Sequence, residues 1–181
     1  MKLFKKLAAA VLAAALALTM VGCGGNSYAM QNELLKITID NLTGVGETVT
    51  HTKKADEMAA ALLAAADTAA AQKENEGMDA KELLQNPAVI KAAKIDLEKT
   101  PCMFNPIDND SQIKSSGTLG EFLKMEWMGS VTRLSRFEPI GTFNPGDNKV
   151  EIGAATHKIG DKNYTLILIT YTPTTTPANP L

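Results

Sequence analysis

The strongest constraint on the fold is a strand-like segment near the C-terminus, Thr165-Leu166-Ile167-Leu168-Ile169-Thr170, in which the four central residues are all apolar. Because neighbouring side chains of a strand point to opposite faces of its sheet, a strand that is apolar at every position must be covered on both faces. Gly160-Asp161-Lys162-Asn163 provides a turn between Lys149–Thr156 and Tyr164–Tyr171, so these two segments predict a β-hairpin. We therefore expect the hairpin to lie at the centre of a layered protein.

Helices are predicted ahead of this hairpin. Lys53–Asn75 contains ten alanines and neither glycine nor proline, so its summed propensity predicts a long helix that ends before Gly77. Apolar residues at helical spacing predict another helix over Gln31–Leu42. Asp79-Ala80-Lys81-Glu82 has the pattern of a capping box, and Asn86-Pro87 opens a helix expected to run to about residue 99.

The remaining segments complete the predicted order. Thr48-Val49-Thr50 is a short extended piece, Thr118-Leu119-Gly120-Glu121 begins a further helix, and Pro139–Phe143 is a third strand-like segment. Residues 173–181 are rich in proline and threonine and predict a disordered tail. Helices followed by strands predict one α+β domain over residues 31–172, with helices packed on a small antiparallel sheet that ends in the hairpin.

The N-terminal 22 residues are a separate unit of the sequence. They begin with three lysines and no acid, and they continue with the uncharged apolar run Leu7–Val21. A membrane-spanning helix needs roughly 20 apolar residues, so this shorter run indicates a secretion signal in residues 1–22 that lies outside the fold. Met20-Val21-Gly22-Cys23 resembles the lipobox of bacterial lipoproteins, with Met20 in place of the usual leucine.

The lipobox resemblance implies that a signal peptidase cuts before Cys23 and that this cysteine carries acyl chains on its sulfur. Each buried methylene contributes about 0.8 kcal/mol, so two or more chains hold a protein durably on a membrane. Residues 23–30 are then expected to be a lipidated spacer. The domain is expected on the extracytoplasmic side of the cell membrane or, in a cell with two membranes, of the outer membrane. A plain secretory signal that happens to end near a cysteine is the alternative.

The charge balance argues against a nucleic-acid partner. Residues 1–22 hold three of the 18 basic residues, so the rest of the chain has 15 Lys and Arg against 20 Asp and Glu. Surfaces that bind nucleic acid carry an excess of positive charge, because they must neutralise phosphates.

Two further features look structural. If Cys23 is acylated, Cys102 has no partner for a disulfide, and without a histidine near it in sequence we interpret it as a buried structural cysteine. Pro106–Ser116 is polar and contains Asp108 and Asp110. It lacks the glycine and glutamate spacing of a helix-loop-helix calcium site, so it predicts a solvated loop.

Four segments, in their order along the chain, resemble parts of one family. Met58–Ala71 is similar to an Ala-rich second helix, and Trp127-Met128-Gly129-Ser130 to a Trp-x-x-Ser motif. Glu151-Ile152-Gly153-Ala154-Ala155 and Tyr164–Tyr171 are similar to an Ile-Gly-Val-Gly segment and a closing strand. Together they resemble a degenerate CAP (SCP-like) domain, the domain of cysteine-rich secretory proteins, antigen 5 and plant pathogenesis-related proteins. The resemblance implies an α-β-α sandwich.

The cavity of that family usually holds two histidines and two acidic residues that bind a divalent ion. Arg133 stands three positions after Ser130, where the second histidine would fall, and Ala64–Asp67 has no histidine, so no metal or other cofactor is predicted. The family's groove often binds lipids, sterols or peptides. The resemblance therefore implies a cleft for an apolar or peptide ligand, with Glu126, Trp127, Ser130 and Arg133 as the candidate lining residues.

These features favour a membrane-anchored lipoprotein whose domain binds a ligand or associates with the cell envelope without catalysis. Two alternatives stay open. One is a cell-envelope hydrolase that uses His51 or His157, the only histidines, with a carboxylate. The other is a scaffolding lipoprotein without a small-molecule site. The sequence has no GxSxG nucleophile elbow, no HExxH zinc-binding helix and no P-loop that would favour a particular class of enzyme.

Overall fold

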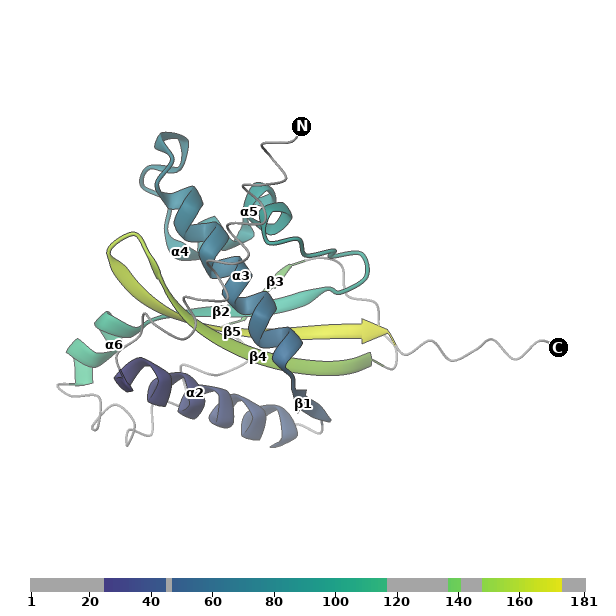
Figure 1. The fold of residues 1–181 in the computed structure, drawn as a ribbon. Helices are drawn as coiled ribbons and strands as arrows, with labels where there is room; N and C mark the ends of the chain where they lie inside the picture. Colours follow the sequence, from purple (N-terminus) through teal and green to yellow (C-terminus); the bar gives the residue numbers. More distant parts are fainter. Residues whose placement is uncertain (1–24, 45–46, 117–136, 141–147, 174–181) are drawn as a thin grey trace.

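The computed structural model describes residues 25–44, 47–116, 137–140 and 148–173, and Figure 1 shows their arrangement. In this part of the chain the strands form one sheet in the order β1-β4-β5-β2-β3. The strands are β1 (Val49–His51), β2 (Cys102–Asp108), β3 (Glu138–Ile140), β4 (Asn148–Ile159) and β5 (Lys162–Pro173). The helices are α2 (Gly25–Gly44), α3 (Lys53–Ala70), the 3-10 helix η1 (Lys73–Asn75), α4 (Ala80–Gln85), α5 (Pro87–Ala92) and α6 (Asn109–Ser116).

The β4–β5 hairpin is the centre of the sheet, as predicted. Leu166, Ile167, Leu168 and Ile169 are all fully buried. Leu166 and Leu168 belong to a hydrophobic cluster with α3, α4 and α5, whereas Ile167 and Ile169 belong to a second cluster with α2. We call these two sides of the sheet the α3 face and the α2 face. The α+β fold is therefore confirmed, with helices on both faces of the sheet.

One strand pairing differs from the predicted antiparallel sheet. β1 runs parallel to β4, with Thr50 opposite Glu151, while the β4–β5, β5–β2 and β2–β3 pairs are antiparallel. Two strands can pair in parallel only when a long crossover joins them, and here the chain from α3 to β3 lies between β1 and β4. The short strand predicted around Val49 is present as β1, and its parallel pairing with β4 makes the sheet a mixed one.

The loop predicted over residues 106–116 is wrong. β2 extends to Asp108, and α6 follows it directly. Pro106 is allowed in this strand because of its position in the ladder. The Tyr171 N–H of β5 donates to the Pro101 carbonyl, and the backbone polar groups of successive strand residues point alternately to the two sides. The Pro106 nitrogen therefore points away from β5. It also lies beyond the three residues of β2 that pair with β3, so no ladder hydrogen bond is lost there.

The first described helix begins earlier than predicted. α2 starts at Gly25, whereas the sequence indicated a spacer over residues 23–30 and a helix from Gln31. Met30 is fully buried in the cluster of the α2 face, so the end of the expected spacer belongs to the domain. Glycine, asparagine and serine have weak helix propensities, so the sequence of residues 25–27 did not indicate the first turn of α2.

The Ala-rich helix is confirmed over most of its predicted length. α3 ends at Ala70 and is followed by η1, and Gly77 has a positive φ of 89°. The buried alanines of α3 pack on the sheet. The capping box of α4 and the Asn86 cap of α5 are also present, although α5 ends at Ala92, well before the predicted position.

Candidate functional site

The predicted lipid-attachment residue and the predicted cleft residues lie outside the described residues. They are Cys23 in residues 1–24, and Glu126, Trp127, Ser130 and Arg133 in residues 117–136. The site that can be built from described side chains is a histidine–aspartate pair at the junction of β1 and α3.

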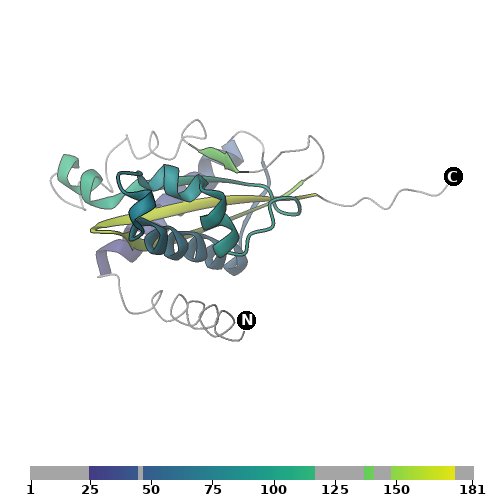
Figure 2. The ribbon, with the colours of Figure 1, turned by 90° about the horizontal axis from the view of Figure 1, so that it is seen from above.

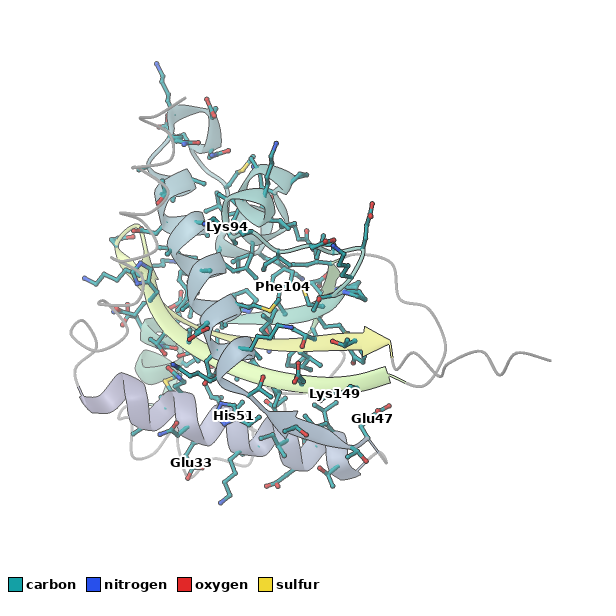
Figure 3. The ribbon with its side chains drawn as sticks, turned by 45° about the vertical axis from the view of Figure 1, so that its right-hand side comes forward. Glu33, Glu47, His51, Lys94, Phe104 and Lys149 are labelled. Atoms are coloured by element: carbon teal, nitrogen blue, oxygen red, sulfur yellow. The ribbon has the colours of Figure 1, made fainter. Side chains whose placement is uncertain are left out.

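His51 and Asp56 form this pair. His51 Nε2 lies 3.0 Å from Asp56 Oδ1 and 2.9 Å from Oδ2. The side chains are 46% and 33% exposed, so the pair is open to solvent. Figure 3 shows His51 where β1 meets the first turn of α3.

The local sequence explains this geometry. His51 is the last residue of β1, and the Thr52 amide donates to the Ile152 carbonyl at 3.1 Å. The Thr52 side chain then accepts from the Ala55 amide at 3.2 Å and caps α3. This sharp change from strand to helix brings Asp56, one turn into α3, back to the ring of His51.

Asp56 is also fixed to the sheet. Its Oδ1 accepts a hydrogen bond of 2.8 Å from the Ala154 amide of β4. The Ala154 carbonyl accepts from Gln31 Nε2 of α2 at 3.0 Å. Side chains of α3 and α2 thus bond the backbone of β4 just beyond the point where β1 stops. The close approach of α3 depends on Gly153, because a Cβ there would lie 2.3 Å from the Ala55 carbonyl carbon and the Asp56 nitrogen.

The pair has the geometry of a base held by a carboxylate. When Asp56 accepts a hydrogen bond from Nε2–H, it fixes the ring tautomer in which Nδ1 carries no proton. Within the described part of the chain Nδ1 makes no hydrogen bond, and a nitrogen in that state can take a proton from water or a substrate. The arrangement also joins β1 to α3, a structural role that needs no chemistry.

His157 has a different environment. Its Nε2 lies 3.9 Å from Asp67 Oδ2, and Asp67 Oδ1 accepts from the Gly160 amide at 2.9 Å in the hairpin turn. His51 pairs with Ile152, which is five residues from His157 along β4, a separation of about 17 Å at strand spacing. The two histidines therefore belong to separate pairs.

The other residues singled out in the sequence have structural surroundings. Cys102 is a free, fully buried cysteine, as predicted, and burial raises the pKa of its thiol to about 12. Asp108 accepts from the Ser111 amide at 2.9 Å and from its hydroxyl at 2.8 Å, at the start of α6. Asp110 accepts from the Asn163 amide at 3.2 Å and so joins α6 to β5.

Burial tends to raise the pKa of the Asp108 carboxyl, but the two hydrogen bonds from Ser111 and the charge of Lys162 outweigh burial, so the pKa lies below its ordinary value. Lys162 Nζ is 3.5 Å from Asp108 Oδ2. In the described ranges no three of the residues His, Cys, Asp and Glu are gathered to hold a metal ion.

Sequence reasoning missed Asp56. Its only sequence signal was its position four residues after Thr52, a residue type that commonly caps helices, with His51 just before the cap.

None of the helices in the described ranges is long and apolar enough to span a membrane. In comparisons with known proteins, no family model, curated protein or solved structure matches the chain.

Proposed function

We propose that the protein is a bacterial lipoprotein, anchored through acylated Cys23, whose α+β domain acts as a non-enzymatic binding or envelope-associated module outside the cytoplasm. One observation carries this proposal. Met20-Val21-Gly22-Cys23 stands at the end of a basic head and an apolar run too short to span a membrane. A thiol at that position, just beyond the apolar run, is what lipid attachment requires.

The ligand of the domain is proposed from the resemblance to CAP domains. Helices on both faces of the sheet agree with an α-β-α sandwich, and the family itself stays a prediction. An apolar or peptide ligand would contact Glu126, Trp127, Ser130 and Arg133. A Trp127→Ala variant is expected to lose ligand binding, whereas changes at His51 or His157 are expected to leave it intact.

The anchor is tested by the intact mass of the protein from the membrane fraction of a bacterial host. The wild type is expected as a chain that begins at Cys23 and carries a diacylglyceryl group. Cys23→Ala is expected to lose this mass and leave the membrane fraction. Cys102→Ala is the matched control and is expected to keep the lipid. An unmodified soluble wild type would contradict the proposal.

The hydrolase alternative has one specific observation in its favour, the short contact between His51 and Asp56. It predicts that ester or peptide reporter substrates are turned over and that His51→Ala and His51→Gln both abolish turnover. A structural pair behaves differently, because a Gln amide can still donate to Asp56. In that case His51→Gln restores the stability that His51→Ala loses, and no variant changes turnover.

A further inference from the structure

The second turn of α2 is bound firmly to the rest of the domain. Gln31 Nε2 donates to the Ala154 carbonyl, and the Thr156 hydroxyl donates to Gln31 Oε1 at 3.2 Å. Met30 and Leu34 on either side of this contact are fully buried. From its second turn onward, therefore, α2 moves with the sheet and cannot act as a flexible arm.

This attachment limits how far Cys23 can lie from the domain. Cys23 stands two residues before Gly25, where α2 begins. The helix rises about 1.5 Å per residue, so Gln31 is about 9 Å along α2 from Gly25. Two extended residues add about 7 Å at most. The Cα atoms of Cys23 and Gln31 are thus within about 16 Å, whereas the 12 residues of β4 alone span about 40 Å.

Several elements share the end of the molecule at which α2 begins. The first turn of α2, the β4–β5 turn at residues 159–162 and α6 all lie on the left in Figure 1, and they stay together in the view from above in Figure 2. We call this the turn end. β1 and the C-terminal end of α2 lie toward the opposite end, which we call the β1 end.

We propose that the anchored domain rests directly on the bilayer through its turn end, with the β1 end directed away from the membrane. This inference rests on the proposed function, because it needs acyl chains on Cys23. The occupant of the turn end is the lipid surface that those chains enter, because an anchor on so short a connection holds the nearest part of the domain against the headgroups.

The charges described at the β4–β5 turn do not hold the domain in this orientation. Lys158, Asp161 and Lys162 are exposed at the turn, and Lys162 faces Asp108, so both signs are mixed there. Attraction to anionic lipids needs a cluster of basic residues. The orientation therefore depends on the length of the connection, and it should persist at high salt, where exposed charges are screened.

The experiment compares two labelled variants of the full, acylated protein, Asp161→Cys and Glu47→Cys. Each replaces one exposed acid, the first at the turn end and the second beside β1, where Figure 3 shows Glu47. Cys102 is buried, and Cys23 is occupied by lipid, so a fluorophore attaches at the new cysteine alone. The proteins are placed in phosphatidylcholine vesicles that contain a lipid with a nitroxide headgroup as quencher.

The label at position 161 is expected to be quenched several-fold more strongly than the label at position 47, at low and at high salt. A flexible insert of ten Gly and Ser residues between Gly24 and Gly25 spans about 18 Å on average and is expected to equalise the two labels.

Equal quenching of the two labels without the insert would overturn the orientation and leave the lipoprotein proposal standing. A wild-type chain that carries no lipid and does not bind vesicles would overturn both.

Discussion

The two faces of the sheet are covered in different ways. On the α3 face, helix α3 contributes mostly small side chains, such as Ala59 and Ala66, both fully buried. On the α2 face most of the buried side chains of the helix are large, among them Met30, Leu34 and Leu42. One helix approaches the backbone of β4 closely, and the other is held away from the sheet by its side chains.

The difference shows that the two interfaces have opposite weaknesses. The α3 face leaves no room for additional atoms, because the space that a Cβ of Gly153 would occupy is filled by the backbone of Ala55 and Asp56. The α2 face depends on volume, so removing atoms leaves a cavity. We expect enlargement to destabilise the α3 face and truncation to destabilise the α2 face.

The largest effect is expected from Leu34→Ala on the α2 face. Leu34 is fully buried, and truncation of such a residue lowers the free energy of unfolding by about 3 kcal/mol. Urea unfolding of the two proteins measures the difference. A loss below about 1 kcal/mol would mean that α2 settles onto the sheet and that the comparison is wrong on this face.

The next effect is expected from Gly153→Ala on the α3 face. The added methyl group meets backbone atoms that cannot rotate away, so we expect a loss of about 2 kcal/mol. Gly44→Ala is the matched control, because a Cβ at Gly44 has nothing within 4 Å. Equal unfolding midpoints for the two variants would show that α3 can move off β4.

A smaller effect is expected from Asp108→Ala. This residue lies opposite Tyr164 at the margin of the α3 face, and loss of its bonds to the start of α6 should cost about 1 kcal/mol at pH 7.

The pH dependence of this effect has a definite sign. Because the pKa of Asp108 is lowered in the folded protein, its stabilising contribution is present above the ordinary pKa of 3.8 and is lost as the pH falls through the lower folded value. Urea unfolding between pH 5 and pH 2 should therefore show a shallower acid loss for Asp108→Ala than for the wild type. An unchanged slope would assign the acid sensitivity to another group.

The smallest effect is expected at Lys94, where α5 ends in the helical layer of the α3 face. Lys94 has a φ of 60°, and the Ile95 amide bonds the Ile90 carbonyl across it. Glycine adopts this backbone conformation without the steric cost of a Cβ, so Lys94→Gly should stabilise the protein by about 0.5 kcal/mol. Thermal unfolding measures this gain, and Lys91→Gly, inside α5, is expected to lower stability instead.

Much of the fold could be predicted because several segments contain their own structural signal. The apolar run at residues 166–169 and the turn at Gly160 predict the hairpin, and the alanines predict α3. β2 could not be predicted, because Pro106 and the polar residues after it are typical of a loop. A strand is possible there only because the register of β2 turns the Pro106 nitrogen away from β5. The parallel pairing of β1 likewise depends on a distant segment.

The site was less predictable than the fold. Cys23 and the four cleft residues were proposed from resemblances, and they lie outside the described residues. His51 was a candidate, but its partner Asp56 was not, because the hydrogen bond that Asp56 accepts from the Ala154 amide cannot be read from residue spacing. Asp56 differs from the other carboxylates of the chain only through the fold, which places it against both the His51 ring nitrogen and the Ala154 amide.

The hydrogen bonds that Ala154 donates to Asp56 and accepts from Gln31 have a consequence for copies of the protein that meet at high concentration. Where β1 stops, the side of β4 would otherwise offer an amide and a carbonyl on which a strand of a neighbouring copy could add, and repeated addition builds fibrils. The two side chains already occupy both groups of Ala154. A strand of a neighbouring copy therefore meets a blocked position at this edge of β4, which opposes polymerisation through it.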